Sequence, residues 1–174
     1  MCIGKFFGTL ALIIAAIFIP GATFAGPNLG REATPAEITG WDLTIPPDGS
    51  GLPAGGGTTD QGEAIFNAKC VSCHGLKGTG GPADPLVGGM GTLASKKPVK
   101  TVGSFWPYAT TLFDYMRRAM PYDRPMSLSN DEVYAVSAYI LFLNGIIDKE
   151  ARLDAKTLPQ VKMPNRDGFV SYWP

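Results

Sequence analysis

The sequence predicts a small all-α domain with long loops, flanked by extended N- and C-terminal arms. Three observations support this prediction. Helical patterns occur in short stretches in the middle of the chain, separated by loop-like segments. Gly and Pro are abundant, at 22 and 15 of 174 residues. Both ends lack clear periodicity, and the length suits one modest domain plus extensions.

Residues 1–25 are predicted to be a signal peptide. Lys5 lies in a short n-region, an apolar run follows it, and Thr23 and Ala25 suit the −3 and −1 positions of a cleavage site. The run is nearly long enough to span a bilayer, so the alternative is an uncleaved anchor. Pro20 breaks the helix where an anchor would continue, which favours cleavage. We therefore expect export to the periplasm, with membrane attachment only if the leader remains.

The charge and cysteine content narrow the class of protein. The 15 basic and 15 acidic residues balance, whereas nucleic-acid binding usually shows as a basic excess. Removal of the leader removes Cys2 and leaves Cys70 and Cys73. An exported protein with no spare cysteine for another disulfide fits one in which both remaining thiols are used covalently.

Residues 26–58 are expected to form an extended arm rather than part of the core. The segment holds 8 Gly and 5 Pro in 33 residues and shows no helical or strand period. Trp41, Leu43 and Ile45 are nonetheless suited to docking onto a surface as an extended segment.

The domain over 59–145 is expected to begin with a short helix, with Asp60 as N-cap, that continues into the sequence CVSCH. The stretch 75–104 is Gly- and Pro-rich and is expected to wrap a large apolar group. A second helix is predicted from Pro107 to Ala119, where Pro at the first turn is favourable and Pro121 ends the helix. Its apolar face is marked by Leu112, Tyr115 or Met116, and Ala119, and Arg117 and Arg118 are expected on a solvated face.

The third helix carries the strongest local signal. Ser129 followed by Glu132 three residues later forms a capping box, and Asn144-Gly145 supplies the C-terminal stop. Residues 146–174 then form a second arm. The apolar positions that follow the capping box at helical spacing are Val133, Val136, Ile140 and Leu143.

The sequence CVSCH, residues 70–74, has the spacing of a c-type haem attachment site. Cys70 and Cys73 would bond the two vinyl groups, and His74 would be held at the iron as the proximal ligand. A zinc site usually needs four protein ligands, which the two cysteines and the chain's single histidine cannot complete. A thioredoxin-like redox pair would need a βαβ pattern, which is absent. One covalent haem c is therefore expected.

The sixth iron position is expected to be filled by a methionine, because His74 is the only histidine. The methionines after the leader are Met90, Met116, Met120, Met126 and Met163. Met120 is predicted as the ligand, because it lies where the second helix ends and Pro121 stiffens the backbone. Met126 is the alternative, and an open site is the third possibility; Met116 is expected in the core.

Five further positions are candidate haem contacts. The His74 ring should donate its free N–H to a carbonyl, for which Pro82 or Pro85 is predicted. Trp106 and Tyr108 are candidates for contact with the haem propionates, as is Lys97. For the two aromatic residues, ordinary core packing with a polar tip is an equal alternative.

The stretch from Gly62 to Gly145 resembles a class I cytochrome c. The resemblance rests on CVSCH, the following GP…L loop, the Met120-Pro121 pair and the AYILFL of the last helix. It implies a small all-α haem domain with long loops. It also implies that Gly62 and Phe66 of the first helix cross the last helix near Tyr139.

A narrower resemblance covers most of the mature chain. The segments ATPAEITGWDLTIPPDGSGLPAGGGT, TVGSFWPYATTLFDYMRRAMPYDRPMSLSNDEVYAVSAYILFLNGI and VKMPNRDGF are similar to the cytochrome subunit of sulfur-compound dehydrogenases, including Sox sulfane dehydrogenase and periplasmic sulfite dehydrogenases. Unlike the two-haem members, this chain has one C-x-x-C-H.

That resemblance implies a non-catalytic, one-electron carrier. It would accept electrons from a molybdenum-cofactor subunit and pass them to another cytochrome c or a terminal oxidase. The alternatives are a free periplasmic shuttle and a haem enzyme or ligand sensor with an open sixth site.

Overall fold

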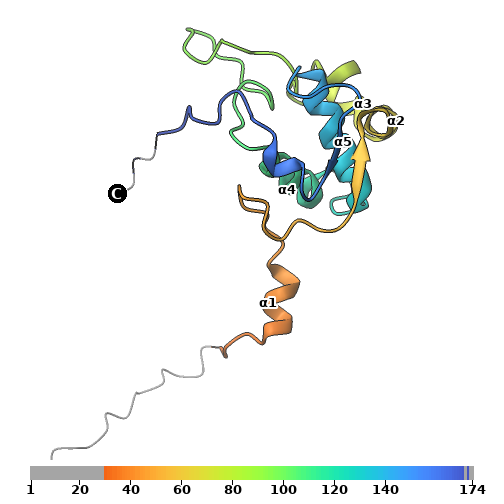
Figure 1. Cartoon of the computed structure of the whole chain (residues 1–174), viewed down its shortest axis with the longest axis vertical. Helices are drawn as coiled ribbons and strands as arrows, with labels where there is room; N and C mark the ends of the chain where they lie inside the picture. Colours follow the sequence, from red (N-terminus) through yellow and green to blue (C-terminus); the bar gives the residue numbers. More distant parts are fainter. Residues whose placement is uncertain (1–29, 171, 173–174) are drawn as a thin grey trace, which may run out of the picture. The chain divides into compact units, whose positions relative to one another are not determined.

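The structure is a computed structural model that describes residues 30–170 and 172 (Figure 1). The predicted signal peptide, residues 1–25, lies outside the described residues. The chain divides into two units, Met1–Ile38 and Thr39–Pro174. In the larger unit, short helices pack around one core and long connections join them, as the sequence predicts. None of the helices within residues 30–170 is both long and apolar enough to cross a membrane.

The core forms where α2 (Thr59–Lys69) crosses α5 (Asn130–Leu143). Gly62 is buried at the crossing, and a Cβ there would clash with the carbonyl oxygen of Ala135. The rings of Phe66 and Tyr139 meet beside it, with centroids 5.4 Å apart. The crossing implied by the class I cytochrome c resemblance is confirmed.

Capping boxes begin both of these helices. At α5, Ser129 and Glu132 bond to each other's backbone N–H, as predicted. At α2 the N-cap is Thr58, whose backbone N–H donates to the Gln61 side chain at 2.9 Å. The prediction of Asp60 as N-cap is wrong, because the reciprocal Thr58–Gln61 bonds start the helix earlier and leave Asp60 in the first turn.

The second predicted helix is α4 (Ala109–Ala119), which begins two residues later than expected. Tyr108 is its N-cap with extended backbone, so Pro107 lies outside the helix. Leu112 and Met116 face the core as expected, together with Phe113. Arg118 is not simply solvated, because it pairs with the nearly buried carboxylate of Asp114 one turn earlier.

The two arms contain structure that the sequence did not predict. Strand β1 (Gly56–Thr58) pairs antiparallel with β2 (Arg152–Asp154), with Gly57 opposite Leu153. Leu153, the short 3-10 helix η3 (Leu158–Gln160) and Met163 then carry buried side chains into the core. Part of the predicted C-terminal arm therefore packs into the core of the domain.

Part of the N-terminal arm packs in the same way. Ile45 is buried, and its backbone N–H donates to the Asp114 carboxylate at 3.1 Å. The Tyr134 hydroxyl donates to the carbonyl oxygen of Pro53 at 2.9 Å. Of the three residues expected to dock, Ile45 does so, Leu43 is half-buried and Trp41 remains 89% exposed.

An ion pair ties the end of α2 to the start of α5, and it predicts a pH dependence. Lys69 Nζ lies 2.5 Å from Glu132 Oε1. Hydrogen bonds from Lys69 and from the Ser129 backbone lower the pKa of Glu132. A carboxyl with a lowered native pKa stabilises the fold above its unfolded pKa, and the contribution is lost as pH falls through the native value.

Glu132→Gln is therefore expected to lower the free energy of unfolding by roughly 0.5–1 kcal/mol at pH 7, since the pair is only partly buried. The difference from wild type should shrink at acid pH, below the ordinary pKa of a glutamate, as the wild-type carboxyl also loses its charge. Urea unfolding of the holo-protein at both pH values measures this, with exposed Glu150→Gln as control. An equal difference at both pH values would contradict the role of the charge.

Candidate haem attachment site

The CVSCH residues lie on one turn of helix directly after α2. Cys70 interrupts the regular geometry (φ −122°, ψ −30°), and α3 (Val71–His74) follows. The His74 backbone N–H donates to the Cys70 carbonyl at 2.9 Å. Positions three and four residues apart share a helix face, so this turn gathers both thiols and the imidazole on one side.

The environment of the two thiols fits covalent attachment to a haem better than it fits a redox-active cysteine pair. Neither Cys70 nor Cys73 is in a disulfide. Burial raises the pKa of the Cys70 thiol to about 11, against the lowering effect of Lys69. A redox-active pair depends on a lowered thiol pKa, so this environment disfavours it. Within the described ranges, no group of three or more His, Cys, Asp or Glu side chains is arranged to hold a metal ion.

The orientation of the His74 ring is set by a backbone carbonyl. Its Nδ1 lies 3.1 Å from the carbonyl oxygen of Asp84. A carbonyl only accepts, so Nδ1 carries the proton and donates, and Nε2 keeps its lone pair for a metal. The prediction that Pro82 or Pro85 supplies this carbonyl is wrong. The acceptor is the carbonyl of Asp84, which lies between the two prolines in the chain.

The loop after CVSCH explains that choice of acceptor. Gly80 N–H donates to the His74 carbonyl and Ala83 N–H to the Cys73 carbonyl, both at 2.9 Å. Gly75 makes the reversal possible with φ +72°, and a Cβ there would clash with the Gly80 carbonyl. The loop therefore closes back onto the attachment turn and brings the Asp84 carbonyl beside the imidazole.

The rest of the loop is fixed by hydrogen bonds from polar side chains for which the sequence indicated no such role. The buried hydroxyls of Thr101 and Ser104 donate to the Gly88 and Val99 carbonyls, each at 2.7 Å. Asn144 donates to the Leu86 carbonyl at 3.2 Å. The sequence marked Asn144 only as a helix stop, and nothing local signalled its reach back across the chain.

The methionines differ in how far their side chains are buried and in the conformation of their backbone. Met116 and Met163 are core residues, 5% and 3% exposed. Met120 is half-buried and caps α4, with its N–H bonded to the Met116 carbonyl at 3.1 Å. Met126 is 59% exposed with φ +61°, and Met90 is 50% exposed. Met120 is thus the candidate anchored to a helix, and its role as sixth ligand stays a prediction, as does the alternative of Met126.

The other predicted contacts are already engaged within the chain. The Trp106 ring meets the Tyr115 ring edge-on at 5.7 Å, and the Arg166 guanidinium lies 5.1 Å from the Tyr108 ring centroid. Trp106 and Tyr108 are both half-buried, whereas Lys97 is exposed. Contact of these residues with propionates stays a prediction.

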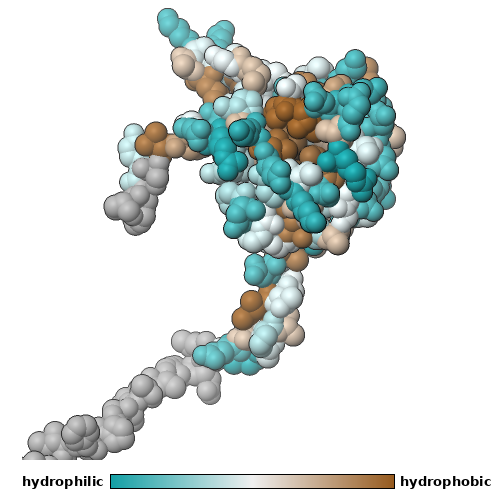
Figure 2. All heavy atoms as spheres, in the orientation of Figure 1, coloured by the Kyte–Doolittle hydropathy of each residue, from teal (hydrophilic) through white to brown (hydrophobic). Residues whose placement is uncertain are grey.

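Apolar surface in this part of the chain also fits a large apolar group. Figure 2 shows hydrophobic residues gathered between hydrophilic ones on a face of the larger unit. Large contiguous apolar patches on a protein surface are typical of binding sites for ligands or partners. Between CVSCH and α5, the exposed large apolar residues are Leu76, Met90, Val99, Tyr115, Tyr122 and Met126. Two thiols and an imidazole with a free Nε2 on one helical turn fit a covalent haem.

Comparisons with known proteins agree with this geometry. The family model for cytochrome c matches residues 59–144. A chain in the crystal structure of the sulfane dehydrogenase SoxCD from Paracoccus pantotrophus is similar, with 42% identity and a TM-score of 0.77. The similarity covers 83% of this chain and 72% of that chain. No curated protein matches significantly.

The similarity to the SoxCD chain extends beyond the haem domain. It takes in about 144 of the 174 residues, whereas the family model spans 86. Only 30 residues follow position 144. At least about 28 of the matched residues therefore precede position 59, so the N-terminal flank is shared as well.

Proposed function

This chain belongs to the cytochrome c family, and from that premise we propose that it is the electron-accepting subunit of a periplasmic, molybdenum-dependent sulfite or sulfane dehydrogenase. Family membership makes it an electron carrier with covalently bound haem c. The observation that carries the narrower proposal is the 42% identity to the SoxCD chain, which reaches into the N-terminal flank.

We assign four residues to the haem. Cys70 and Cys73 would hold it through thioethers, and His74 Nε2 would be the proximal ligand. Met120, anchored at the end of α4, would be the distal ligand. The bound haem supplies an iron that changes between Fe(II) and Fe(III). The protein's part is to fix the ligands, so that little reorganises when one electron arrives or leaves.

The Asp84 carbonyl has a defined part in this scheme. By accepting the Nδ1–H of His74 it holds the tautomer and the ring orientation that ligation needs, and it raises the basicity of Nε2. A thioether at the sixth position favours Fe(II), which suits an electron acceptor. With both axial positions filled by the protein, substrate chemistry would take place on the partner subunit.

The proposed organisation follows from the same reasoning. A signal peptide over 1–25 would direct export, and the haem domain would cover 59–145 with flanks over 26–58 and 146–174. Electrons would pass from the dehydrogenase to the haem, and then to another cytochrome c or a terminal oxidase. A free shuttle would use the same haem domain, but it would not require a flank shared with a sulfane dehydrogenase.

Purification of the native protein tests the proposal. The chain is expected to co-elute with a molybdenum-containing subunit, and sulfite or a sulfane-sulfur substrate should reduce its haem in the complex. The isolated cytochrome, mixed with the same substrates, serves as the control and should stay oxidised. A chain that elutes alone, with no molybdenum protein and no substrate-dependent reduction, would support a free shuttle instead.

A further inference from the structure

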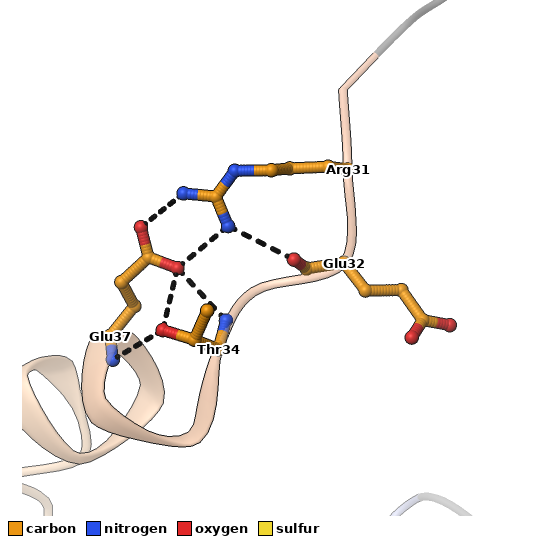
Figure 3. Close-up of polar contacts among 4 residues, drawn as sticks. All are labelled: Arg31, Glu32, Thr34 and Glu37. Carbon is orange, nitrogen blue, oxygen red and sulfur yellow. Dashed lines mark hydrogen bonds and ion pairs between the residues drawn. The ribbon is translucent and has the colours of Figure 1, made fainter.

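The helix α1 (Pro35–Trp41) is capped by its own local contacts (Figure 3). The Thr34 N–H and hydroxyl donate to Glu37 Oε2 at 2.8 and 2.9 Å, and the Glu37 N–H donates back to the Thr34 hydroxyl. Arg31 binds both carboxylate oxygens of Glu37, at 2.8 and 2.5 Å. Pro35 in the first turn completes a typical helix start.

These contacts are local to the helix and the residues just before it. None of its residues is buried. Helices as short as seven residues are marginal in water without packing, so the cap and the ion pair are what favour it. Arg31 and Thr34 also hold the pKa of Glu37 at about 2, so the carboxylate that makes these contacts stays charged near neutral pH.

The apolar residues of α1 are exposed. Ile38 is 54% exposed and Trp41 is 89% exposed. They are three residues apart and so share one face of the helix. Elsewhere in the flanks, Ile45 and Leu158 are buried. The N-terminal flank thus contains the buried Ile45 and, in α1, the exposed side chains of Ile38 and Trp41.

We propose that the Ile38–Trp41 face of α1 docks into an apolar groove of the dehydrogenase subunit, with Trp41 as the main anchor. This inference rests on the proposed function. A continuous match of at least about 28 residues before position 59 begins no later than about residue 31. Helix α1 therefore lies in the part that this chain shares with a chain of a sulfane dehydrogenase.

The physical basis is the helix-in-groove mode of recognition, in which apolar side chains at i and i+3 enter a hydrophobic groove. Tryptophan is enriched among residues that dominate binding energies, because its large ring loses much water-exposed surface and little conformational freedom. A helix already favoured by its cap loses less entropy on binding than an unstructured segment.

The test compares variants of the C-terminally tagged holo-cytochrome. The probe is the molybdenum-containing subunit recovered from the native complex. Trp41→Ala is expected to raise Kd at least about tenfold, and Trp41→Phe to retain most of the affinity. The matched control, Tyr172→Ala, removes a 98% exposed aromatic side chain and should leave Kd unchanged. The visible spectrum and reduction midpoint should be the same in all variants.

Several outcomes would overturn the inference. Equal Kd values for wild type and Trp41→Ala would exclude α1 as the anchor while leaving the proposed function intact. An altered haem spectrum or lower stability in Trp41→Ala would show that the ring covers its own haem domain. Wild-type binding to anionic lipid vesicles that is lost in Trp41→Ala would assign it to a membrane. A wild type that binds no molybdenum subunit would overturn the proposed function and this inference together.

Discussion

Gly62→Val is expected to prevent the chain from forming its native core. A Cβ at position 62 would clash with the Ala135 carbonyl and lie 2.8 Å from Tyr139 Cβ, on the opposing helix. These are backbone and near-backbone atoms, so no side-chain rotation relieves the contact. Helices α2 and α5 would have to separate, which should cost at least about 3 kcal/mol, a large part of the stability of a small domain.

Thermal and urea unfolding of the holo-protein measure this effect, together with the yield of haem-containing protein. Ala64→Val is the matched control, because it adds the same β-branched side chain to an exposed position of the same helix. The control should lose less than about 1 kcal/mol. Gly62→Val protein that unfolds with wild-type stability would show that α2 and α5 do not cross at Gly62.

Met120→Ala is expected to change the protein from an electron carrier into a ligand-binding haem protein. Loss of the thioether should remove the absorption band at about 695 nm in the oxidised protein and lower the reduction potential. The reduced protein should then bind CO rapidly, because the sixth position is open. The covalent haem should remain, since Cys70, Cys73 and His74 are unchanged.

Two matched variants identify the ligand. Met126→Ala and Met90→Ala remove thioethers that are 59% and 50% exposed, and both should keep the band and the potential. Loss of the band in Met126→Ala alone would assign the sixth position to Met126. Retention of the band in all three variants would exclude each of these methionines as the ligand.

The parts of the fold that the sequence predicted are those with local causes. The Ser129–Glu132 box was recognisable because both partners lie within one turn. The Thr58–Gln61 box has the same local form, but the adjacent Asp60 offered a competing N-cap. The start of α4 was misplaced because Pro favours a first turn without specifying which residue begins it.

The strand pair had no sequence signal. Its two strands have three residues each and lie more than 90 positions apart, too short and too distant for a period to show. Their pairing depends on Gly57 approaching the backbone of Ala135 on α5. The docking of Ile45 likewise depends on Asp114, a residue that the sequence placed on a helix without a role.

Some residues of the candidate site could be predicted from the sequence, and others could not. The spacing of CVSCH alone placed Cys70, Cys73 and His74 on one helical turn. The carbonyl that orients His74 was not predictable, because it depends on how the following loop closes on the backbone of Cys73 and His74. The apolar face of α1 was hidden in a segment whose Gly and Pro content suggested no helix.

We propose that both axial ligands come from this chain and stay bound in both redox states. The most direct measurement is the absorption spectrum of the purified wild-type holo-protein, oxidised and then reduced under CO. We predict a band at about 695 nm in the oxidised protein and no CO binding after reduction. A spectrum without that band, followed by rapid CO binding, would contradict the account and assign the protein to open-site haem chemistry.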